Sequence, residues 1–420
     1  MAPTTSLLRR ARARVRSRPL VASDSARRAR PRKSPPEEDP ATALPDDMLL
    51  EVFKRLPPPT DTIRCAAVCR RWRRIISSGA RAGCLPTPPR HFGFFRNYHQ
   101  SPLPPFVATE SGVGVGLDVG GLLPRVVLKH GVDIVDGRGG LLVLRERSKK
   151  FWELNLVLCS PLERSYRRLP PVNISGYDMA CAAFVPLEGV SFRVAAVLFG
   201  GAEHLWRRYA VLVYDLASAP PAAWKVTTGS RPHGERHYNA HEGPSVVVGD
   251  VVYSLQGEHI MVVDTAKMTM SVLPEPVAHP DWLVDGNHWI GKTEDARLCF
   301  FVFHEYKPLL VERWPLGADD KWTPQQPLRL PRDLHGVKLT TGFSEVSSSF
   351  KRVRFAGFCK GSRMLFFVMD DWVVSFDIET LEMERLWCCD TDEPRWLGGL
   401  SEVYPYEMMA WPPVLKDFAH

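Results

Sequence analysis

Three histidines in the sequence are spaced in a way that could bind a metal. His233, His237 and His241 recur every four residues. On a helix this spacing would place three imidazole rings on one face. Pro232 and Gly243 bracket the segment, however, and these residue types are typical of loops. We therefore expect a loop without a metal, and the sequence predicts no cofactor.

Motifs for other catalytic chemistry are weak. The glycines from Gly112 to Gly121 have the composition of a phosphate-binding loop, but they open no helix and lack a Lys-Ser/Thr ending. No Gly-x-Ser-x-Gly motif of a serine nucleophile occurs. Acid–base catalysis needs carboxylates on opposite sides of a cleft, whereas pairs such as Asp319-Asp320 are adjacent and fall in predicted turns. The sequence therefore predicts a non-catalytic protein.

The positive charge of the chain is concentrated near its start. The sequence has 54 Lys and Arg against 47 Asp and Glu. Residues 1–36 hold 11 of the basic residues and one acidic residue, so the other 384 residues hold 43 basic and 46 acidic groups. A domain that binds nucleic acid carries its positive charge on the folded surface. We therefore expect no nucleic-acid partner.

Residues 1–40 are predicted to be a disordered basic tail, because they contain too few apolar residues to form a core. The cluster Ala26–Lys33 fits a nuclear-import signal, with a transit peptide and a solvated tail as alternatives. Nine cysteines without a Cys-x-x-Cys pair fit a reducing compartment. No run approaches the about 18 apolar residues of a membrane span. We expect a protein of the nucleus and/or cytoplasm without a membrane partner.

Residues 41–80 are predicted to form three short helices. In the first, four apolar residues recur at helical spacing on one face: Leu49, Val52, Phe53 and Leu56. Pro57-Pro58-Pro59 ends this helix, because three successive residues lack an N–H group. The second helix directs Ile63, Ala66 and Ala67 inward. The third has one apolar face, Val68, Trp72, Ile75 and Ile76, with the arginines facing away: Arg70, Arg71, Arg73 and Arg74.

Helices this short bury little surface by themselves, so their apolar faces indicate a protein partner. A small helical cap on the following domain is the alternative. Three blocks of this segment resemble the F-box: Leu44–Phe53, Arg55–Pro57 and Val68–Ile76. The triple proline is the one departure from the family, which usually has one or two prolines at this point. The resemblance covers roughly 36 residues in order.

The F-box resemblance implies docking onto the Skp-type adaptor of a Skp–cullin–F-box ubiquitin ligase (SCF), and through it onto cullin. By this analogy the adaptor contacts are nine residues: Leu44, Pro45, Leu49, Val52, Phe53, Leu56, Val68, Cys69 and Trp72.

After a Pro-rich linker at residues 81–89, the pattern changes to short β-branched and aromatic runs, which is typical of an all-β domain over residues 90–415. The predicted strands include Val194–Phe199, Ala210–Tyr214 and a long Val246–Leu255. Five strand-end anchors repeat at spacings of 55, 49, 51 and 62 residues: Ser160, Asp215, Asp264, Pro315 and Asp377. Such periods indicate propeller blades, and each Asp is expected to cap a tight turn.

Residues 90–415 span 326 positions, which at this period gives six blades, with five or seven as alternatives. We expect the first blade to use His91–Tyr98 and Val126–Lys129, and the segment Leu400–Trp411 to close the ring. Two packed β-sandwiches are the structural alternative. The fold prediction is a small all-α F-box followed by a six-bladed β-propeller.

The all-β region also resembles the kelch-like F-box-associated β-propellers of a large plant family. The segments that carry this resemblance are Asp136–Leu144, Val157–Leu162 and Arg167–Pro171. The resemblance implies a domain that recognises a target protein.

Aromatic and basic residues in predicted loops are candidates for target binding, because Trp, Tyr and Arg dominate binding hot spots. The candidates are His204, Trp206, Arg208, Tyr238, Trp282 and Trp289. The alternative for any one Trp is packing between blades, since large aromatic side chains are mostly buried.

Together these features predict a substrate-recognition subunit of a ubiquitin ligase. It would act by proximity, holding a target protein near the ubiquitin-transfer machinery. The alternative is a propeller enzyme or carbohydrate-binding protein with the helices as a structural cap. A third possibility is an F-box protein that acts as a scaffold outside the ligase.

Overall fold

The structure is a computed structural model of the 420-residue chain. It describes residues 44–56, 59–85, 91–97, 102–109, 130–147, 150, 152–162, 165–187, 192–200, 208–216, 223–230, 245–256, 259–276, 288–293, 295–303, 310–329, 333–334, 337–338, 353–359, 364–369, 372–378, 380–388 and 403–407. The chain divides into two units, Met1–Pro45 and Asp46–His420. The predicted basic tail, residues 1–40, lies outside the described residues.

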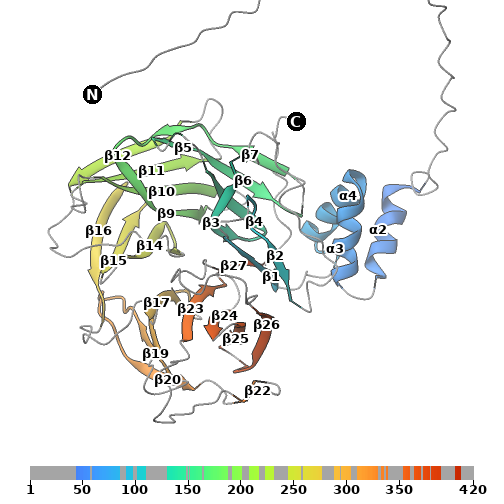
Figure 1. Ribbon diagram of the computed structural model, residues 1–420. Helices are drawn as coiled ribbons and strands as arrows, with labels where there is room; N and C mark the ends of the chain where they lie inside the picture. Colours follow the sequence, from blue (N-terminus) through green and yellow to red (C-terminus); the bar gives the residue numbers. More distant parts are fainter. Residues whose placement is uncertain are drawn as a thin grey trace, which may run out of the picture. The chain divides into compact units, whose positions relative to one another are not determined.

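Three helices follow one another at the start of the second unit (Figure 1): α2 (Asp46–Lys54), α3 (Pro59–Val68) and α4 (Arg70–Arg81). Two acidic residues, Asp46 and Asp47, occupy the first turn of α2, where they face the positive end of the helix dipole. Helix α3 begins at Pro59, and proline is favoured at a first helical position because its missing N–H has no partner there. The three predicted helices are confirmed.

In the described part of the chain, five four-stranded antiparallel sheets and one three-stranded sheet form a six-bladed propeller (Figure 1). The first blade is β3 (Val132–Arg138), β4 (Leu141–Glu146), β6 (Leu156–Ser160) and β7 (Ser165–Arg168). The second is β9 (Tyr177–Pro186), β10 (Phe192–Gly200), β11 (Arg208–Asp215) and β12 (Lys225–Ser230). The third is β13 (Val246–Val248), β14 (Val251–Gln256), β15 (His259–Asp264) and β16 (Thr269–Pro274).

The fourth blade is β17 (His288–Lys292), β18 (Leu298–Phe303), β19 (Leu310–Pro315) and β20 (Gln325–Arg329). The fifth is β23 (Val353–Phe358), β24 (Met364–Met369), β25 (Trp372–Asp377) and β26 (Met383–Cys388). The described residues also form two small two-stranded sheets: β5 (Glu153–Leu154) with β8 (Val172–Asn173), and β21 (Asp333–Leu334) with β22 (Val337–Lys338).

The sixth blade joins the two ends of the domain. Strand β1 (His91–Arg96) pairs with β2 (Phe106–Ala108) on one side and with β27 (Val403–Glu407) on the other. Strand β27 in turn contacts β3 and β23 of the neighbouring blades. Closure by the C-terminal strand, as the sequence predicts, protects the edges of the ring. The predicted contribution of Val126–Lys129 lies outside the described residues.

Two sequence expectations about local structure need correction or refinement. Val246–Leu255 is not one strand but the hairpin β13–β14, because Gly249 adopts a left-handed φ of 58° and turns the chain. The Asp caps are confirmed at two outer hairpins: Asp264 Oδ1 accepts hydrogen bonds from the N–H groups of Ala266 and Lys267, and Asp377 Oδ1 accepts one from Thr380.

Candidate functional site

The inner side of the helical unit is a small apolar core. Leu49 and Phe53 of α2 are buried, as are Ile63 of α3 and Ile76 of α4. Trp72 is half-buried and meets the Phe53 ring edge-on, with 5.4 Å between ring centroids. Burial at every third to fourth residue is the pattern expected for amphipathic helices.

The arginines of α4 do not all face away, which corrects one expectation. Arg73 is buried, and its Nε donates a hydrogen bond to the Ala66 carbonyl oxygen at 3.1 Å. The cause is geometric, since Arg73 lies between the inward-facing Trp72 and Ile76 on the helix. Arg71 is half-buried and pairs with Asp46 at the start of α2, with 2.8 Å between Nη2 and Oδ1.

Several large apolar side chains of the helical unit remain exposed. The exposed fractions are 52% for Met48 and 48% for Val52, which lie one turn apart on α2, and 65% for Val68 at the end of α3. Leu44, which precedes α2, is 37% exposed. Apolar surface of this kind marks interaction sites when several such residues occur together.

The nine predicted adaptor contacts fall into three groups. Leu44, Pro45, Val52, Val68 and Cys69 are exposed; Leu56 and Trp72 are half-buried; Leu49 and Phe53 belong to the core. Cys69 is also the N-cap of α4, where its Sγ accepts a hydrogen bond from the Trp72 N–H at 3.5 Å. Sequence reasoning missed Met48, although its position four residues before Val52 could have indicated it.

In the propeller, buried hydrogen bonds connect neighbouring blades. Asp136 of β3 accepts hydrogen bonds from the N–H of Gly137 at 2.9 Å and from the N–H of Phe184, in the second blade, at 2.7 Å. Tyr406 of β27 donates its hydroxyl proton to the Gly140 carbonyl oxygen of the first blade at 3.0 Å. These bonds tie the closing strand and the first two blades together.

A tryptophan-to-proline contact occurs twice between consecutive blades. Trp224 of the second blade donates its indole N–H to the Pro170 carbonyl oxygen of the first at 2.7 Å. Trp322 of the fourth blade donates to Pro274 of the third at 2.9 Å. Both prolines follow a leucine near the end of the outer strand of their blade, as Leu169-Pro170 and Leu273-Pro274. Part of the visible repeat therefore encodes contacts between blades.

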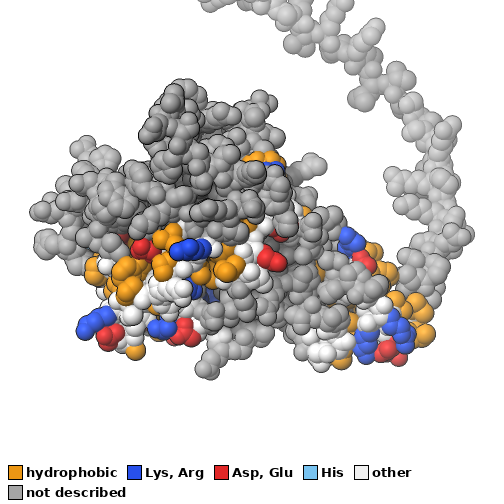
Figure 2. Space-filling model, turned by 90° about the horizontal axis from the view of Figure 1, so that it is seen from below, with side chains coloured by type: hydrophobic (Ala, Val, Ile, Leu, Met, Phe, Trp, Pro, Cys, Tyr) orange, Lys and Arg blue, Asp and Glu red, His pale blue; other side chains and the backbone are white. Residues whose placement is uncertain are grey.

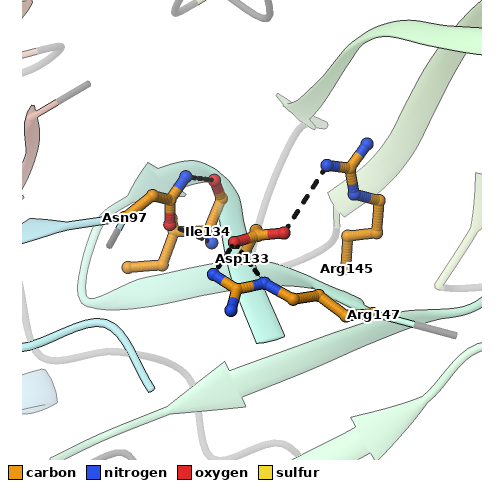
Figure 3. A network of polar contacts seen from close by, with 5 residues as sticks. All are labelled: Asn97, Asp133, Ile134, Arg145 and Arg147. Carbon is orange, nitrogen blue, oxygen red and sulfur yellow. Dashed lines mark hydrogen bonds and ion pairs between the residues drawn. The ribbon is translucent and has the colours of Figure 1, made fainter. Parts of the chain in front are cut away.

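A polar network joins the closing sheet to the first blade (Figure 3). The Asn97 side chain bonds both backbone groups of Ile134, donating from Nδ2 to the carbonyl oxygen at 2.8 Å and accepting from the N–H at 2.7 Å. Beside it, Asp133 pairs with Arg147, whose Nε donates to Oδ1 at 2.9 Å, and with Arg145 at 3.5 Å. Asn97 thus ties the closing sheet to β3, while the Asp133 ion pairs join β3 to the arginines at the end of β4.

The target-binding candidates are mostly outside the described residues: His204, Trp206, Tyr238 and Trp282. Arg208 is exposed at the start of β11, where its guanidinium lies 5.7 Å from the Tyr177 ring centroid. The sequence predicts a loop at Trp289, and this prediction is wrong: Trp289 lies in strand β17. It is 3% exposed and stacks on Phe355 at 4.2 Å, because the segment continues the apolar inner face of the fourth blade.

The candidates for catalytic and metal chemistry can be compared with the described residues. The histidines at 233, 237 and 241 lie outside the described residues, and among the residues described no three His, Cys, Asp or Glu side chains could hold a metal. Burial raises the pKa of the Cys159 and Cys299 thiols to about 12, which makes both poor nucleophiles. No helix in the described part of the chain is long and apolar enough to cross a membrane.

Charged side chains of both signs occur on the face of the molecule that Figure 2 draws. In Figure 2, Lys and Arg side chains are mixed with Asp and Glu, and hydrophobic side chains lie among them. A basic stripe that could follow a nucleic-acid backbone is not visible among the described residues of this face.

Comparison with known families agrees with this architecture. Residues 41–81 match the F-box-like family, and residues 133–415 match the family described as "F-box protein AT5G49610-like, beta-propeller". The helices and blades thus define an F-box protein with a C-terminal propeller. Since the second match spans more than half of the chain, the chain belongs to this propeller-bearing F-box family.

The matches to solved structures have low sequence identity and TM-scores below 0.5. A chain of the mitotic checkpoint complex is 12% identical, with a TM-score of 0.33, and the match covers 64% of this chain and 65% of that one. The WD40 domain of SCAP from fission yeast is 9% identical, with a TM-score of 0.27 and coverages of 61% and 64%. The extracellular domain of a putative one-component system from B. thetaiotaomicron is also 9% identical, with a TM-score of 0.27 and coverages of 61% and 28%.

The chain spans less than two thirds of the length of each of these three chains. No curated protein sequence matches the chain significantly.

Proposed function

We propose that this protein is the substrate-recognition subunit of a Skp–cullin–F-box ubiquitin ligase. F-box domains generally bind Skp-type adaptors, and proteins of this propeller family are typically non-catalytic receptors. In the proposed complex the helices dock on the adaptor and, through it, on cullin. The propeller holds a target protein for ubiquitination in the nucleus or cytoplasm, and the rate gain comes from proximity.

The observation that carries this proposal is the division of apolar side chains in the helical unit. Leu49 and Phe53 complete its own core, whereas Met48, Val52 and Val68 stay exposed. A helical cap that served only its own chain would gain stability by burying such side chains, at about 25 cal/mol per Å² of apolar surface. Their exposure fits a surface that a partner covers.

The test is a binding measurement between the full chain and a purified Skp-type adaptor. The variant Val52→Glu/Val68→Glu places two carboxylates on the proposed surface without touching the core. We expect it to bind at least about tenfold more weakly. The matched control is Trp152→Glu, which places a carboxylate at a 48%-exposed aromatic residue of the propeller. Equal binding by all three proteins, or no binding by the unmodified chain, would refute the proposal.

A further inference from the structure

Arg208 is the target-binding candidate from the sequence that is exposed within the described part of the chain. It begins β11 and lies opposite Gly200 of β10, and Gly200 in turn lies opposite Tyr177 of β9. Opposed residues of antiparallel strands point to the same face of a sheet. Tyr177, Gly200 and Arg208 therefore form one row across three strands of the second blade.

Gly200 allows the two outer side chains of this row to meet. Their Cα atoms are about 10 Å apart, since neighbouring strands are separated by about 4.8 Å. A Cβ atom at Gly200 would lie 2.8 Å from the Tyr177 ring, so the ring lies close over the glycine. The guanidinium carbon of Arg208 is 5.7 Å from the centroid of that ring, which is within the range of a cation–π contact.

The tyrosine that supports Arg208 is itself held in place. Tyr177 is half-buried and packs against the apolar core that the first two blades share. Its backbone N–H donates a hydrogen bond to the Ile174 carbonyl oxygen at 2.8 Å. A guanidinium supported by such a ring has less conformational freedom to lose when it binds a ligand.

The positive charge of Arg208 has no anionic partner in the part of the chain that the structure describes. Its side chain makes the contact with the Tyr177 ring, and no ion pair or side-chain hydrogen bond joins it to a described residue. Other arginines of the propeller pair with carboxylates: Arg147, Arg168 and Arg193. Arg208 is therefore a supported, exposed cation that can accept an anion from outside the chain.

A carboxylate fits this site better than a phosphate. The planar guanidinium forms two parallel hydrogen bonds with a carboxylate, and its one charge balances that of the ligand. A phosphate group carries about two negative charges and is bound by clusters of arginines. The residues on either side of Arg208 in the row, Gly200 and Ser230, are uncharged.

An exposed aromatic residue is connected to Tyr177 through the backbone. Trp152 is 48% exposed, and its carbonyl oxygen accepts a hydrogen bond from the N–H of Ile174 at 2.7 Å. Since Ile174 also bonds Tyr177, one residue joins the backbones of Trp152 and Tyr177. Trp, Tyr and Arg are the residue types that dominate binding hot spots.

We propose that Arg208, supported by Tyr177, binds a carboxylate of an acidic segment of the target protein, and that Trp152 contacts an apolar side chain of the same segment. The partner is thus a protein segment in which Asp or Glu occurs near an aromatic or aliphatic residue. Calling this partner a target rests on the proposed function, whereas the carboxylate site does not.

The test is saturation-transfer NMR of the full chain with short peptides that carry one glutamate and one phenylalanine at varied spacing among glycines and serines. We expect at least one spacing to bind with a dissociation constant below about 1 mM. Arg208→Ala should weaken this binding at least about tenfold, and so should glutamine in place of glutamate. The matched control Arg329→Ala removes an exposed arginine at the end of β20 and should leave binding unchanged.

Two further variants separate the charge of Arg208 from its geometry and support. Arg208→Lys keeps the charge but loses the planar pair of donors, and Tyr177→Leu keeps an apolar side chain but removes the ring. We expect both to weaken binding, each by less than Arg208→Ala. Full binding by both variants would overturn the role of the supported guanidinium.

Three other results would overturn the proposal: no binding of any peptide, equal effects of Arg208→Ala and Arg329→Ala, or tighter binding when phosphoserine replaces the glutamate. The measurement contains no adaptor, so its failure would leave the adaptor-binding test unaffected. A chain that binds the peptides but no adaptor would refute the proposed function and leave the carboxylate site standing.

Discussion

The helical unit and the propeller treat their large apolar side chains in opposite ways. Among the described residues, seven large hydrophobic side chains are exposed, and four of them lie in the short stretch from Leu44 to Val68. The propeller, several times longer, has three: Trp152, Val226 and Leu381. The propeller buries its apolar side chains by closing its ring, whereas the helical unit leaves apolar side chains exposed. We therefore expect substitutions of buried propeller residues to change the stability of the fold, and substitutions of exposed apolar residues in the helical unit to change binding.

The largest expected effect is the loss of a buried propeller aromatic. Trp289 lies between Phe355 and Phe301, with ring centroids 4.2 and 5.5 Å away. Trp289→Ala leaves a cavity, and we expect a loss of about 3–5 kcal/mol in the free energy of unfolding, measured by urea denaturation.

The matched change in the helical unit is Val52→Ala, at a side chain that is 48% exposed. We expect it to alter the free energy of unfolding by less than about 0.5 kcal/mol. A large loss here would show that Val52 supports the fold, and the contrast between the two regions would fail.

A smaller effect is expected from the buried carboxylate between the first two blades. Asp136→Ala removes the acceptor of the Gly137 and Phe184 N–H groups. Since Asp136 is buried, both donors lose a charged partner, and we expect a cost of about 1.5–3 kcal/mol in urea denaturation. Thr228→Ala, at an exposed site on β12, is the control and should change little. An unchanged midpoint for Asp136→Ala would mean that blade contacts do not limit stability.

The two tryptophan-to-proline contacts should each contribute less than the Asp136 carboxylate. Trp224→Phe and Trp322→Phe keep an aromatic ring but remove the indole N–H that donates to Pro170 or Pro274. We expect each to cost about 0.5–1.5 kcal/mol plus some packing. The measurement is thermal unfolding of both variants against the unmodified chain. If one variant is neutral and the other is not, the two contacts are not equivalent parts of a repeat.

The sequence predicted architecture better than side-chain placement, for physical reasons. Helical spacing and long-period repeats survive in the sequence because every helix and blade must bury its own apolar face. Helical spacing alone assigns Leu49 and Val52 to one apolar face. Leu49 is buried and Val52 is exposed because only part of that face of α2 packs into the core shared with α3 and α4. The sequence predicts a loop at Trp289, whereas the structure places it in β17, where the ring that stacks on it belongs to another blade.

The target-binding surface is the part least accessible from sequence. Four of the six candidates lie outside the described residues, and Trp289 is a core residue. Only Arg208 remains an exposed candidate within the described part of the chain. Aromatic and basic composition cannot separate a recognition loop from a contact between blades, because the same residue types serve both.

Chemical labelling of cysteines compares the two regions without any substitution. Cys69 and Cys84, beside the helices, are exposed, whereas Cys159 and Cys299 of the propeller are buried with a pKa raised to about 12. Only the thiolate reacts with iodoacetamide. Of these four thiols, we therefore expect mass spectrometry of the native chain at a pH of about 8 to find label on Cys69 and Cys84 and not on Cys159 or Cys299.

Raising the pH toward about 9 should not change this pattern, because a thiol with a pKa near 12 remains almost fully protonated there. Denaturation in urea exposes all four thiols and is the positive control. Native labelling of Cys159 or Cys299 at a rate close to that of Cys69 would show that the blades open readily, and the propeller would then not be the self-sufficient region that its buried core implies.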